Sequence, residues 1–326
     1  MNAHPFDTLT PDCLLDAMDS LGLRASSSLL ALNSYENRVY QVGMDEGPPL
    51  IAKFYRPARW SEAQILEEHG FLAELAAAEV PVVAALEVDG RTLHQHAGFH
   101  FAVFPRRGGR SPELDDPEVL AWLGRFMGRI HAVGGQRTYA ARPAVDIASF
   151  GDEPLAWLLQ SDFIPRDQRE DFGQLAKAAL VEVRRCFEAA GEVAQLRLHG
   201  DCHASNILWT DAGPHFVDFD DSRSGPAIQD LWMLLSGERQ DRVRQLADLL
   251  AGYEDFCEFN SRELYLIEAL RTLRLLHYKA WLARRWDDPA FPSAFPWFGT
   301  GHYWQQSMLE LREQIAQMNE PPLWPV

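Results

Sequence analysis

Apolar residues in the first hundred positions gather in short runs, which polar residues and glycine interrupt. This pattern predicts antiparallel strands. A pair of runs around Asp89 and Gly90 is hairpin-like, because this dipeptide suits a tight turn. The predicted strands lie within 26–43, 49–57, 80–88 and 100–110.

Helical spacing occurs twice in this region and dominates the rest of the chain. Thr10-Pro11-Asp12 predicts the start of a short helix that runs to about Leu21. Within 61–80, Ser61 is a candidate N-cap, and the spacing of isoleucine and leucine gives an apolar face. From Pro112 onward the helix-like segments are 118–134, 174–191, 230–256 and 263–286.

A β-rich stretch at residues 196–221 interrupts the helical part. Its turn is predicted at 211–214, Asp-Ala-Gly-Pro, with a strand on either side. A linker-like FPRRGG segment separates the β-rich third of the chain from the helical two-thirds. We therefore expect an α+β fold with two lobes and a cleft between them: a β-rich N-terminal lobe over 1–104 and a mostly helical C-terminal lobe over 105–326.

The composition excludes several classes of protein. The chain has 326 residues, of which 47% are hydrophobic and 24% charged, as is ordinary for a soluble globular protein. Its net charge of −17 argues against a nucleic-acid partner, because such proteins carry a basic surface. The four cysteines are scattered without a CxxC pair, which favours a reducing cytoplasm. The N-terminal segment does not resemble a signal peptide, and no apolar run suits a membrane span. We expect a cytoplasmic monomer with no membrane partner.

The stretch LHGDCHASNILW, residues 198–209, gathers side chains that can carry chemistry. A zinc site would use His199, Cys202 and His203, but a second pair of ligands is not evident. A nucleophilic Cys202 would need an adjacent base, and neighbouring side chains on an extended loop diverge. Both interpretations are weaker than a third, which uses other members of the stretch.

Asp201, Asn206 and Asp218 have the arrangement that protein kinases use for phosphoryl transfer. In that arrangement Asp201 accepts or orients the proton of the attacking hydroxyl. Asn206 and Asp218 supply oxygen ligands to Mg²⁺, and ATP is the phosphoryl donor. Each residue alone would be an ordinary turn residue. Together they predict a protein-kinase-like fold in which Asp201 and Asp218 are catalytic.

A kinase-like β-rich lobe also needs a lysine on a central strand and a glutamate on the following helix. Lys53 lies in an apolar strand, where an ammonium group without a partner would be costly. Comparison of the end of the helix with related kinases favours Glu68 as the partner of Lys53. Glu67 stays open as the alternative.

The remaining nucleotide contacts are predicted by position. The segment between the first two strands takes the place of the phosphate-covering loop, although it is not glycine-rich. Within it, Ser34 and Asn37 can offer polar groups to the phosphates. Val103 and Phe104, in the connector between the lobes, are expected to meet the adenine. Downstream, Asp230 either supports the catalytic loop by hydrogen bonds or caps a helix.

With these residues assembled, the chain resembles the aminoglycoside phosphotransferase and choline kinase superfamily, whose signature HGDxHxxN occurs at residues 199–206. It is more closely similar to the bacterial stress response kinase A family. The likeness runs nearly end to end, through LNSYENRVYQV, KFYRPxRW, QILEEH, LHGDCHxxNILW, FVDxDD, GPAxQDLWMLL, DPAFPxxFPW and EPPL. That family has glycine where this chain has Ser205, which exchanges one small side chain for another.

The resemblance implies a cytoplasmic serine/threonine protein kinase that depends on Mg²⁺ and ATP and helps cells survive envelope and oxidative stress. It implies that Asp201 is the proton acceptor, that Asn206 and Asp218 bind magnesium, and that Ser34 lies at the ATP site. Ordinary protein kinases have an arginine where this chain has Gly200, and a longer segment after the second aspartate. Control by phosphorylation of an activation loop is therefore not expected.

The catalytic residues do not separate a protein kinase from a kinase of alcohols or amino alcohols, since both need the same set. The aromatic segment 277–298 would either wall a small pocket for an apolar or cationic group or serve packing alone. A pseudokinase that acts as a scaffold would lack a catalytic member, and none is missing. We expect protein substrates, with a small-molecule acceptor as the alternative.

Overall fold

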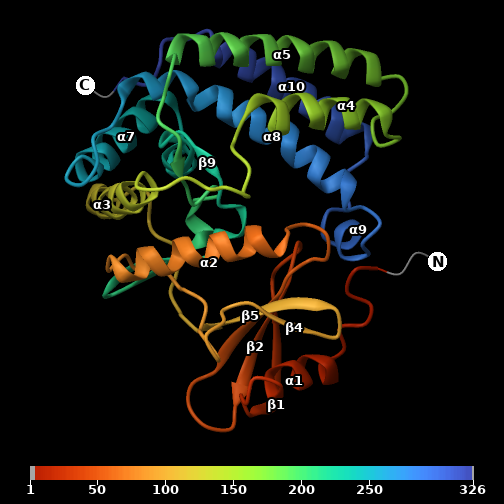
Figure 1. The fold of residues 1–326 in the computed structure, drawn as a ribbon. Helices are drawn as coiled ribbons and strands as arrows, with labels where there is room; N and C mark the ends of the chain where they lie inside the picture. The colour runs from red at the N-terminus through yellow and green to blue at the C-terminus, as the bar shows by residue number, and fades with distance from the viewer. Residues whose placement is uncertain (1–3, 325–326) are drawn as a thin grey trace. The chain divides into compact units, whose positions relative to one another are not determined.

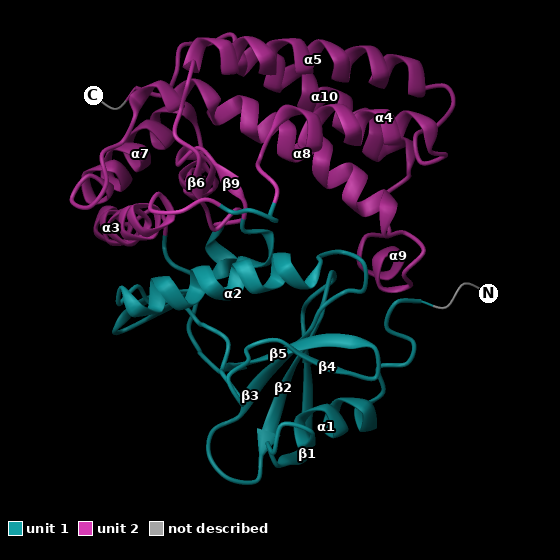
Figure 2. Cartoon of the chain, in the orientation of Figure 1, with its two compact units in different colours: residues 1–113, 139–142, 203–222 teal, residues 114–138, 143–202, 223–326 magenta. Residues whose placement is uncertain are grey.

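The computed structural model describes residues 4–324 and has an α+β fold. Packing divides the chain into two compact units (Figure 2). The first unit comprises 1–113, 139–142 and 203–222, and the second comprises 114–138, 143–202 and 223–326. The predicted boundary between two lobes after residue 104 stays a prediction. Residues 1–3 lie outside the described residues. They belong to the N-terminal segment that was not expected to be a signal peptide.

The first unit is built on one antiparallel sheet with the strand order β1-β2-β3-β5-β4 (Figure 1). The strands are β1 (Ala25–Leu32), β2 (Arg38–Met44), β3 (Leu50–Phe54), β4 (His94–His96) and β5 (Phe99–Pro105). The strands predicted within 26–43, 49–57 and 100–110 are confirmed, and the first of these regions holds two strands. β3 is the central strand, with β2 on one side and β5 on the other.

Side chains of β3 and β5 alternate between the two faces of the sheet. The helices of this unit are α1 (Pro11–Asp19) and α2 (Glu62–Ala77). Phe54 and Val103 are buried on one face, in a core shared with α1. Phe104 lies on the other face, in a core that includes Ile65 of α2. Lys53, one position before Phe54, therefore points to the same face as Phe104.

Both helices start at the polar residues that the sequence predicts. The Thr10 side chain accepts a hydrogen bond from the Cys13 backbone N–H at 3.2 Å. Ser61 and Gln64 form a capping box, in which each side chain accepts the backbone N–H of the other. These contacts satisfy N–H groups that the first turn of a helix leaves without partners. They fix where α2 begins, and so which of its side chains face the sheet.

The strand predicted at 80–88 is wrong. Only isolated bridges form there, and Pro81 lacks the N–H that a strand ladder requires. The turn that follows does form, with φ of 51° at Asp89 and 73° at Gly90. Positive φ at both positions is the geometry of the type I′ hairpin turn.

The hairpin predicted within 196–221 is confirmed, and its strands belong to the first unit. The strands are β7 (Ile207–Thr210) and β8 (Gly213–Phe216). Trp209 and Arg110 exchange two backbone hydrogen bonds, and the Phe216 N–H donates to the Pro81 carbonyl at 2.8 Å. These bonds tie the hairpin to the β-rich unit, although helices precede it in the chain.

The second unit is mainly helical. Its α-helices are α3 (Pro117–Gly134), α4 (Glu153–Gln160), α5 (Arg169–Ala190), α6 (Ile228–Leu231), α7 (Arg239–Tyr253), α8 (Ile267–Arg284), α9 (Ala290–Ala294) and α10 (Gly301–Met318). Its two short strands, β6 (Leu196–Arg197) and β9 (Ser224–Gly225), pair with each other. Across the described chain, short 3₁₀ or π turns cover Ala148–Asp152, Ala204–Asn206, Phe219–Asp221, Trp232–Leu234 and Ser261–Leu266. No helix within residues 4–324 is long and apolar enough to cross a membrane.

Two of the later predicted helices, 118–134 and 174–191, are confirmed, and the other two are interrupted. The segment 230–256 divides into α6, a 3₁₀ turn and α7, because the chain becomes extended at Leu235. The segment 263–286 starts in a 3₁₀ turn and continues as α8. Helices α4, α9 and α10 are not among the predicted ones.

Candidate active site

The predicted catalytic loop follows β6 in the second unit, and Asp230 of α6 holds it. One carboxylate oxygen of Asp230 accepts the His199 backbone N–H at 2.7 Å, and the other accepts that of Gly200 at 2.8 Å. Asp230 is fully buried, and a ring nitrogen of His131 lies 3.2 Å from it. Gly200 has a φ of 88°, which L side chains rarely adopt. The prediction that Asp230 supports the loop is confirmed.

The Asp201 carboxylate forms an ion pair with Arg274 of α8. The distance from Arg274 Nη1 to Asp201 Oδ1 is 2.5 Å, and both side chains are partly exposed. Arg274 also lines a hollow of about 480 Å³ in the second unit, together with Trp232 and Tyr278. The sequence alone does not indicate this pair, because the two residues are far apart in the chain and α8 carries several arginines. The positive charge of Arg274 at this distance attracts the carboxylate and restricts its orientation.

The alternative interpretations of the HGDCHASN stretch are not supported. Cys202 is fully buried, and burial raises the pKa of its thiol well above the usual value. A reactive cysteine needs the opposite shift. Its Sγ instead packs 3.7 Å from the sulfur of Met127. Within residues 4–324, no group of three or more His, Cys, Asp or Glu side chains is placed to hold a metal ion, as zinc would need.

Lys53 is buried on β3, and three carboxylates surround its ammonium group. Nζ is 3.0 Å from Asp220, 3.3 Å from Asp218 and 4.0 Å from Glu68. Burial alone would lower the pKa of Lys53, but the carboxylates raise it well above the usual value. The side chain therefore stays charged. The predicted placement of Lys53 is confirmed, and its contact with phosphates stays a prediction.

Asp220 lies beside Lys53, and its position was not predicted from the sequence. Its buried carboxylate pairs with Arg59 as well as with Lys53. Burial works against its charge, but Arg59 and Lys53 together hold the pKa of Asp220 well below its usual range. Arg59 also pairs with Asp221 at 2.7 Å. The stretch FVDFDD has three aspartates within four positions, so the sequence does not single out Asp220. Only its contacts in the structure distinguish it from the other two.

Asn206 and Asp218 flank the β7–β8 hairpin. The Asn206 carbonyl accepts the Val217 N–H at 3.0 Å, so Asp218 directly follows the residue opposite Asn206. Asp218 has left-handed backbone angles, φ 61° and ψ 62°, and its side chain is 57% exposed. Such a conformation is uncommon outside glycine and concentrates at functional sites. Amide and carboxylate oxygens suit Mg²⁺, which takes its other ligands from water and phosphate. The two residues fit the ion, and their role as ligands stays a prediction.

A pocket of about 250 Å³ lies within the first unit. Much of its lining is apolar and comes from the sheet, from α2 and from the hairpin. Of the predicted nucleotide contacts, Ser34, Lys53, Glu68 and Phe104 line it, and so does the predicted metal ligand Asp218. Ligand pockets typically combine such apolar walls with a few placed polar groups. This lining suits a flat base together with phosphates.

Asn37 and Val103 are not among the described residues that line this pocket. Asn37 is buried, and its side-chain oxygen accepts the Arg56 backbone N–H at 3.1 Å. Val103 lies on the face of the sheet that packs against α1. Strand alternation, applied to β5, would have separated Val103 from Phe104. Contacts of Asn37 and Val103 with a nucleotide stay predictions.

The adjacent glutamates of α2 have different partners. Glu68 is buried and is the one beside Lys53. The Glu67 carboxylate instead accepts the backbone N–H groups of residues 140–142, at 2.6 to 3.0 Å. Burial opposes the charge of Glu67, but these hydrogen bonds lower its pKa. The structure thus places Glu68, and not Glu67, next to the lysine.

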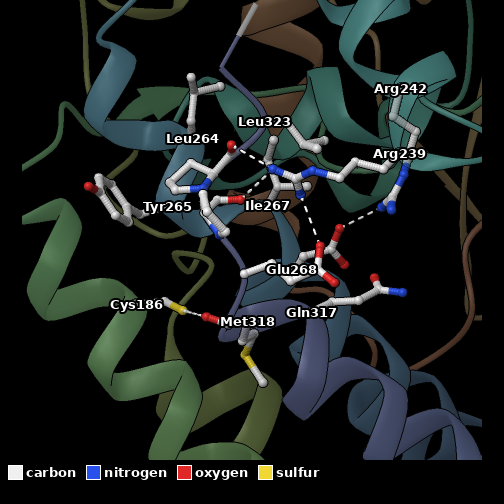
Figure 3. Close-up of a pocket in the computed structure, with 13 residues that line it drawn as sticks. Cys186, Arg239, Arg242, Leu264, Tyr265, Ile267, Glu268, Gln317, Met318 and Leu323 are labelled. Carbon is white, nitrogen blue, oxygen red and sulfur yellow. Dashed lines mark hydrogen bonds and ion pairs between the residues drawn. The ribbon is translucent and has the colours of Figure 1, made fainter.

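A smaller hollow, of about 40 Å³, lies around the C-terminal residues of the second unit (Figure 3). Arg239 donates hydrogen bonds to the carbonyls of Pro321 and Pro322. Arg242 pairs with Glu268 at 2.7 Å. The space admits only a few water molecules. These contacts tie the C-terminal segment to the helices and do not form a nucleotide site.

Comparison with known proteins assigns the chain to a family. Residues 28–276 match the phosphotransferase enzyme family. Stress response kinase A of Salmonella choleraesuis (strain SC-B67) is 47% identical over 322 residues, covering 99% of this chain and 97% of the relative. A protein of Salmonella typhimurium (strain LT2) named serine/threonine protein kinase RdoA is 46% identical, with the same coverage.

Two solved structures share the fold at low sequence identity. Amicoumacin kinase hAmiN, in complex with AMP-PNP, Ca²⁺ and Ami, has a TM-score of 0.73 and 19% identity, covering 96% of this chain and 95% of that chain. The microcompartment-associated aminopropanol kinase has a TM-score of 0.69 and 22% identity, with coverage of 94% and 96%. The family match and the close relatives agree with the residues assembled above: the chain belongs to the phosphotransferase enzyme family and, within it, to the stress response kinase A family.

Proposed function

We propose that this member of a kinase family uses ATP and Mg²⁺ to phosphorylate serine and threonine hydroxyls of proteins, as part of a stress response. The observation that carries the proposal is the buried Lys53, held by carboxylates at the edge of a largely apolar pocket. The names of the relatives, stress response kinase A and serine/threonine protein kinase RdoA, support the physiological part of the proposal.

The first unit binds the nucleotide in this proposal. Phe104 and the apolar walls hold the adenine, and Ser34 contributes a polar group to the phosphates. Lys53 holds the α- and β-phosphates, and Glu68 keeps the lysine side chain in place. Because phosphoryl transfer needs little covalent chemistry from the protein, such positioning supplies much of the rate enhancement.

Magnesium is expected at Asn206 and Asp218. When bound, the ion neutralises negative charge on the phosphates. The backbone hydrogen bond between Asn206 and Val217 keeps the two ligands at neighbouring positions of the hairpin. The hairpin, rather than a separate loop, therefore sets the spacing of the metal ligands.

Asp201 acts on the acceptor in this proposal. Its carboxylate accepts or orients the proton of the attacking hydroxyl, which is the task of a general base. Arg274 fixes one carboxylate oxygen through the 2.5 Å ion pair. Asp230 holds the backbone on which Asp201 is mounted, through the two residues that precede it.

A kinase of small alcohols or amino alcohols is the second candidate. It is favoured by two structures of the same fold whose names describe an amicoumacin kinase and an aminopropanol kinase. The aromatic segment 277–298 gives it less support. Trp281 and Phe291 pack with ring centroids 5.0 Å apart, and Phe291 is fully buried, which is the pattern of core packing.

The proposal extends to partners and location. The partners are protein substrates, and neither nucleic acid nor a membrane takes part. The net charge of −17 disfavours a nucleic-acid backbone and would attract basic protein surfaces. We infer that the protein acts in the cytoplasm as a monomer.

The test uses the purified chain with Mg²⁺ and γ-labelled ATP. Acceptors are the chain itself, generic basic proteins, and a panel of alcohols and amino alcohols. The variant is Asp201→Ala, and the matched control is Asp45→Ala, which removes an exposed carboxylate on a loop.

Label on protein serine or threonine that is lost in Asp201→Ala and kept in Asp45→Ala is the expected result. Label found only on a small alcohol would replace the proposal with the second candidate. Label that survives in Asp201→Ala would remove Asp201 from its role.

A further inference from the structure

Arg142 lies in a segment that leaves the helical part of the chain. Residues 139–142 follow α3 in sequence, yet they pack within the first unit (Figure 2). The Arg142 side chain is completely buried there. A buried guanidinium is costly unless its five N–H donors find partners.

The partners of Arg142 on one side belong to α2 and its start. Nη2 donates to Glu68 Oε2 at 2.8 Å, and Nε donates to the Gln64 carbonyl at 2.7 Å. The guanidinium carbon also lies 4.8 Å from the centre of the Trp60 ring. The backbone N–H of Arg142 is among those that bind Glu67. Two successive glutamates of one helix are thus fixed by one short segment.

The partners on the other side belong to the stretch that carries Asp218. Nη1 donates to the carbonyls of Asp220 at 2.9 Å and of Ser222 at 2.7 Å. Tyr139, from the same segment as Arg142, contacts the Ser222 hydroxyl at 2.6 Å. The planar guanidinium therefore joins helix α2 to the chain that follows β8.

Glu68 is closer to Arg142 than to Lys53. Its carboxylate is 1% exposed, and the Lys53 ammonium is 4.0 Å away, whereas Arg142 is at hydrogen-bonding distance. Removal of one partner from a buried ion pair leaves a charge that water cannot reach. Without Arg142, Glu68 would lose the hydrogen bond that orients its carboxylate beside the lysine.

We propose that Arg142 is a positioning residue that holds Glu68 and the Asp218 stretch in fixed relation to Lys53, so that the nucleotide site is assembled without any phosphorylation of the chain. Other kinases achieve this alignment when a phosphate on an activation loop meets an arginine. In this chain the ion pair between Arg142 and Glu68 would produce the same alignment without a phosphate. The inference rests on the proposed nucleotide role of Lys53.

The test compares Arg142→Gln, Arg142→Lys and wild type. Arg184→Gln is the control, since Arg184 makes a half-exposed ion pair with Asp152 in the second unit. Calorimetric titration with Mg²⁺ and a non-hydrolysable ATP analogue gives the number of binding sites and their affinity. Label transfer from γ-labelled ATP is then expressed per binding site, with wild type also measured after phosphatase treatment.

Turnover per site is expected to fall roughly 10- to 100-fold in Arg142→Gln, because small misplacements of reacting groups have effects of this size. Arg142→Lys should retain part of the wild-type turnover, and the control Arg184→Gln should retain all of it. Phosphatase treatment should leave the wild type unchanged. A purely structural role predicts fewer binding sites with normal turnover at each one, and that result overturns the inference. A loss of turnover on dephosphorylation overturns it as well.

A second variant keeps the test decisive if Arg142→Gln does not fold. Glu67→Ala removes the anchor of the 140–142 backbone and leaves the Arg142, Glu68 and Lys53 side chains intact. It should lower turnover per site in the same direction, by a smaller factor, and unchanged turnover would overturn the inference. The proposed function can fail separately. If nucleotide binding depends on Arg142 but no protein becomes labelled, the protein-kinase assignment is wrong and the role of Arg142 is unaffected.

Discussion

The two compact units hold their functional residues by different means. In the first, Lys53 sits among carboxylates from a helix and from the stretch after a hairpin, and each charge depends on opposite charges from distant parts of the chain. In the second, one buried carboxylate, Asp230, holds the candidate catalytic loop through two backbone N–H groups. The surroundings of Lys53 are therefore a network with several partners for each charge. The loop is held mainly through its backbone, by Asp230 and by Gln229, whose side chain donates to the Gly200 carbonyl at 3.3 Å.

The largest effect is expected from a change that removes the proposed proton acceptor of the loop and leaves the backbone contacts of the loop in place. Asp201→Asn keeps the size of the side chain and removes the proton acceptor. Turnover should fall about 10²- to 10⁴-fold, the range for loss of a general base. Thermal unfolding should change little, because partly exposed ion pairs contribute little to stability. Kinetics and a melting curve on one sample check both parts, and a fall of less than tenfold would contradict the role of Asp201.

The support that Asp230 gives to the loop is tested by Asp230→Ala. The change leaves two backbone N–H groups without their acceptor in a buried place, which costs about 3 kcal/mol of unfolding free energy. Urea denaturation measures this loss, and turnover should fall with it. Asp167→Ala, at an exposed position of the same unit, is the matched control. A loss below about 1 kcal/mol would mean that the loop has other supports.

The charged surroundings of the first unit predict a pH dependence at His69. This buried imidazole contacts the hydroxyls of Tyr55 and Thr92, and burial, with the nearby charges of Lys53 and Arg142, lowers its pKa to about 3. In the unfolded chain a histidine has a pKa of about 6.5. As the pH falls below that value, the unfolded state takes up the proton first, so stability is lost.

Between pH 7 and pH 5 this one group should remove about 2 kcal/mol from the free energy of unfolding. Denaturation curves of wild type and His69→Gln across this range test the effect. The wild type should lose more stability than the variant on acidification. Parallel pH profiles of the two proteins would contradict a neutral, buried His69.

The smallest expected effect concerns the ion pair between Arg274 and Asp201. Arg274→Gln removes the positive charge beside Asp201 and should lower turnover about tenfold, which corresponds to about 1.4 kcal/mol. Nucleotide affinity should stay unchanged, because the predicted nucleotide pocket is lined by residues of the other unit. Arg274→Lys should restore part of the turnover. An equal change in affinity and turnover would show that Arg274 does not act through Asp201.

The same contrast explains how much could be predicted from the sequence. The candidate catalytic loop is encoded locally, so the spacing of Asp201, Asn206 and Asp218 predicts it from the sequence alone. Lys53 and Glu68 could be placed because a central strand and a capped helix give each a defined face. The α+β class followed from the change of apolar spacing along the chain.

Contacts between distant segments could not be predicted in this way. Arg142, Asp220 and Arg274 are ordinary charged residues in the sequence, and only folding brings each to its partner. Two other predictions could have been corrected from the sequence itself. Pro81 argued against a strand at 80–88, and strand alternation separated Val103 from Phe104.

The most direct test of the site is a crystal structure of the chain with Mg²⁺ and a non-hydrolysable ATP analogue. The prediction is a nucleotide in the pocket of the first unit, with its phosphates at Lys53 and the metal bound by Asn206 and Asp218. A nucleotide bound elsewhere, or a metal ion held without those two residues, would contradict the proposed site.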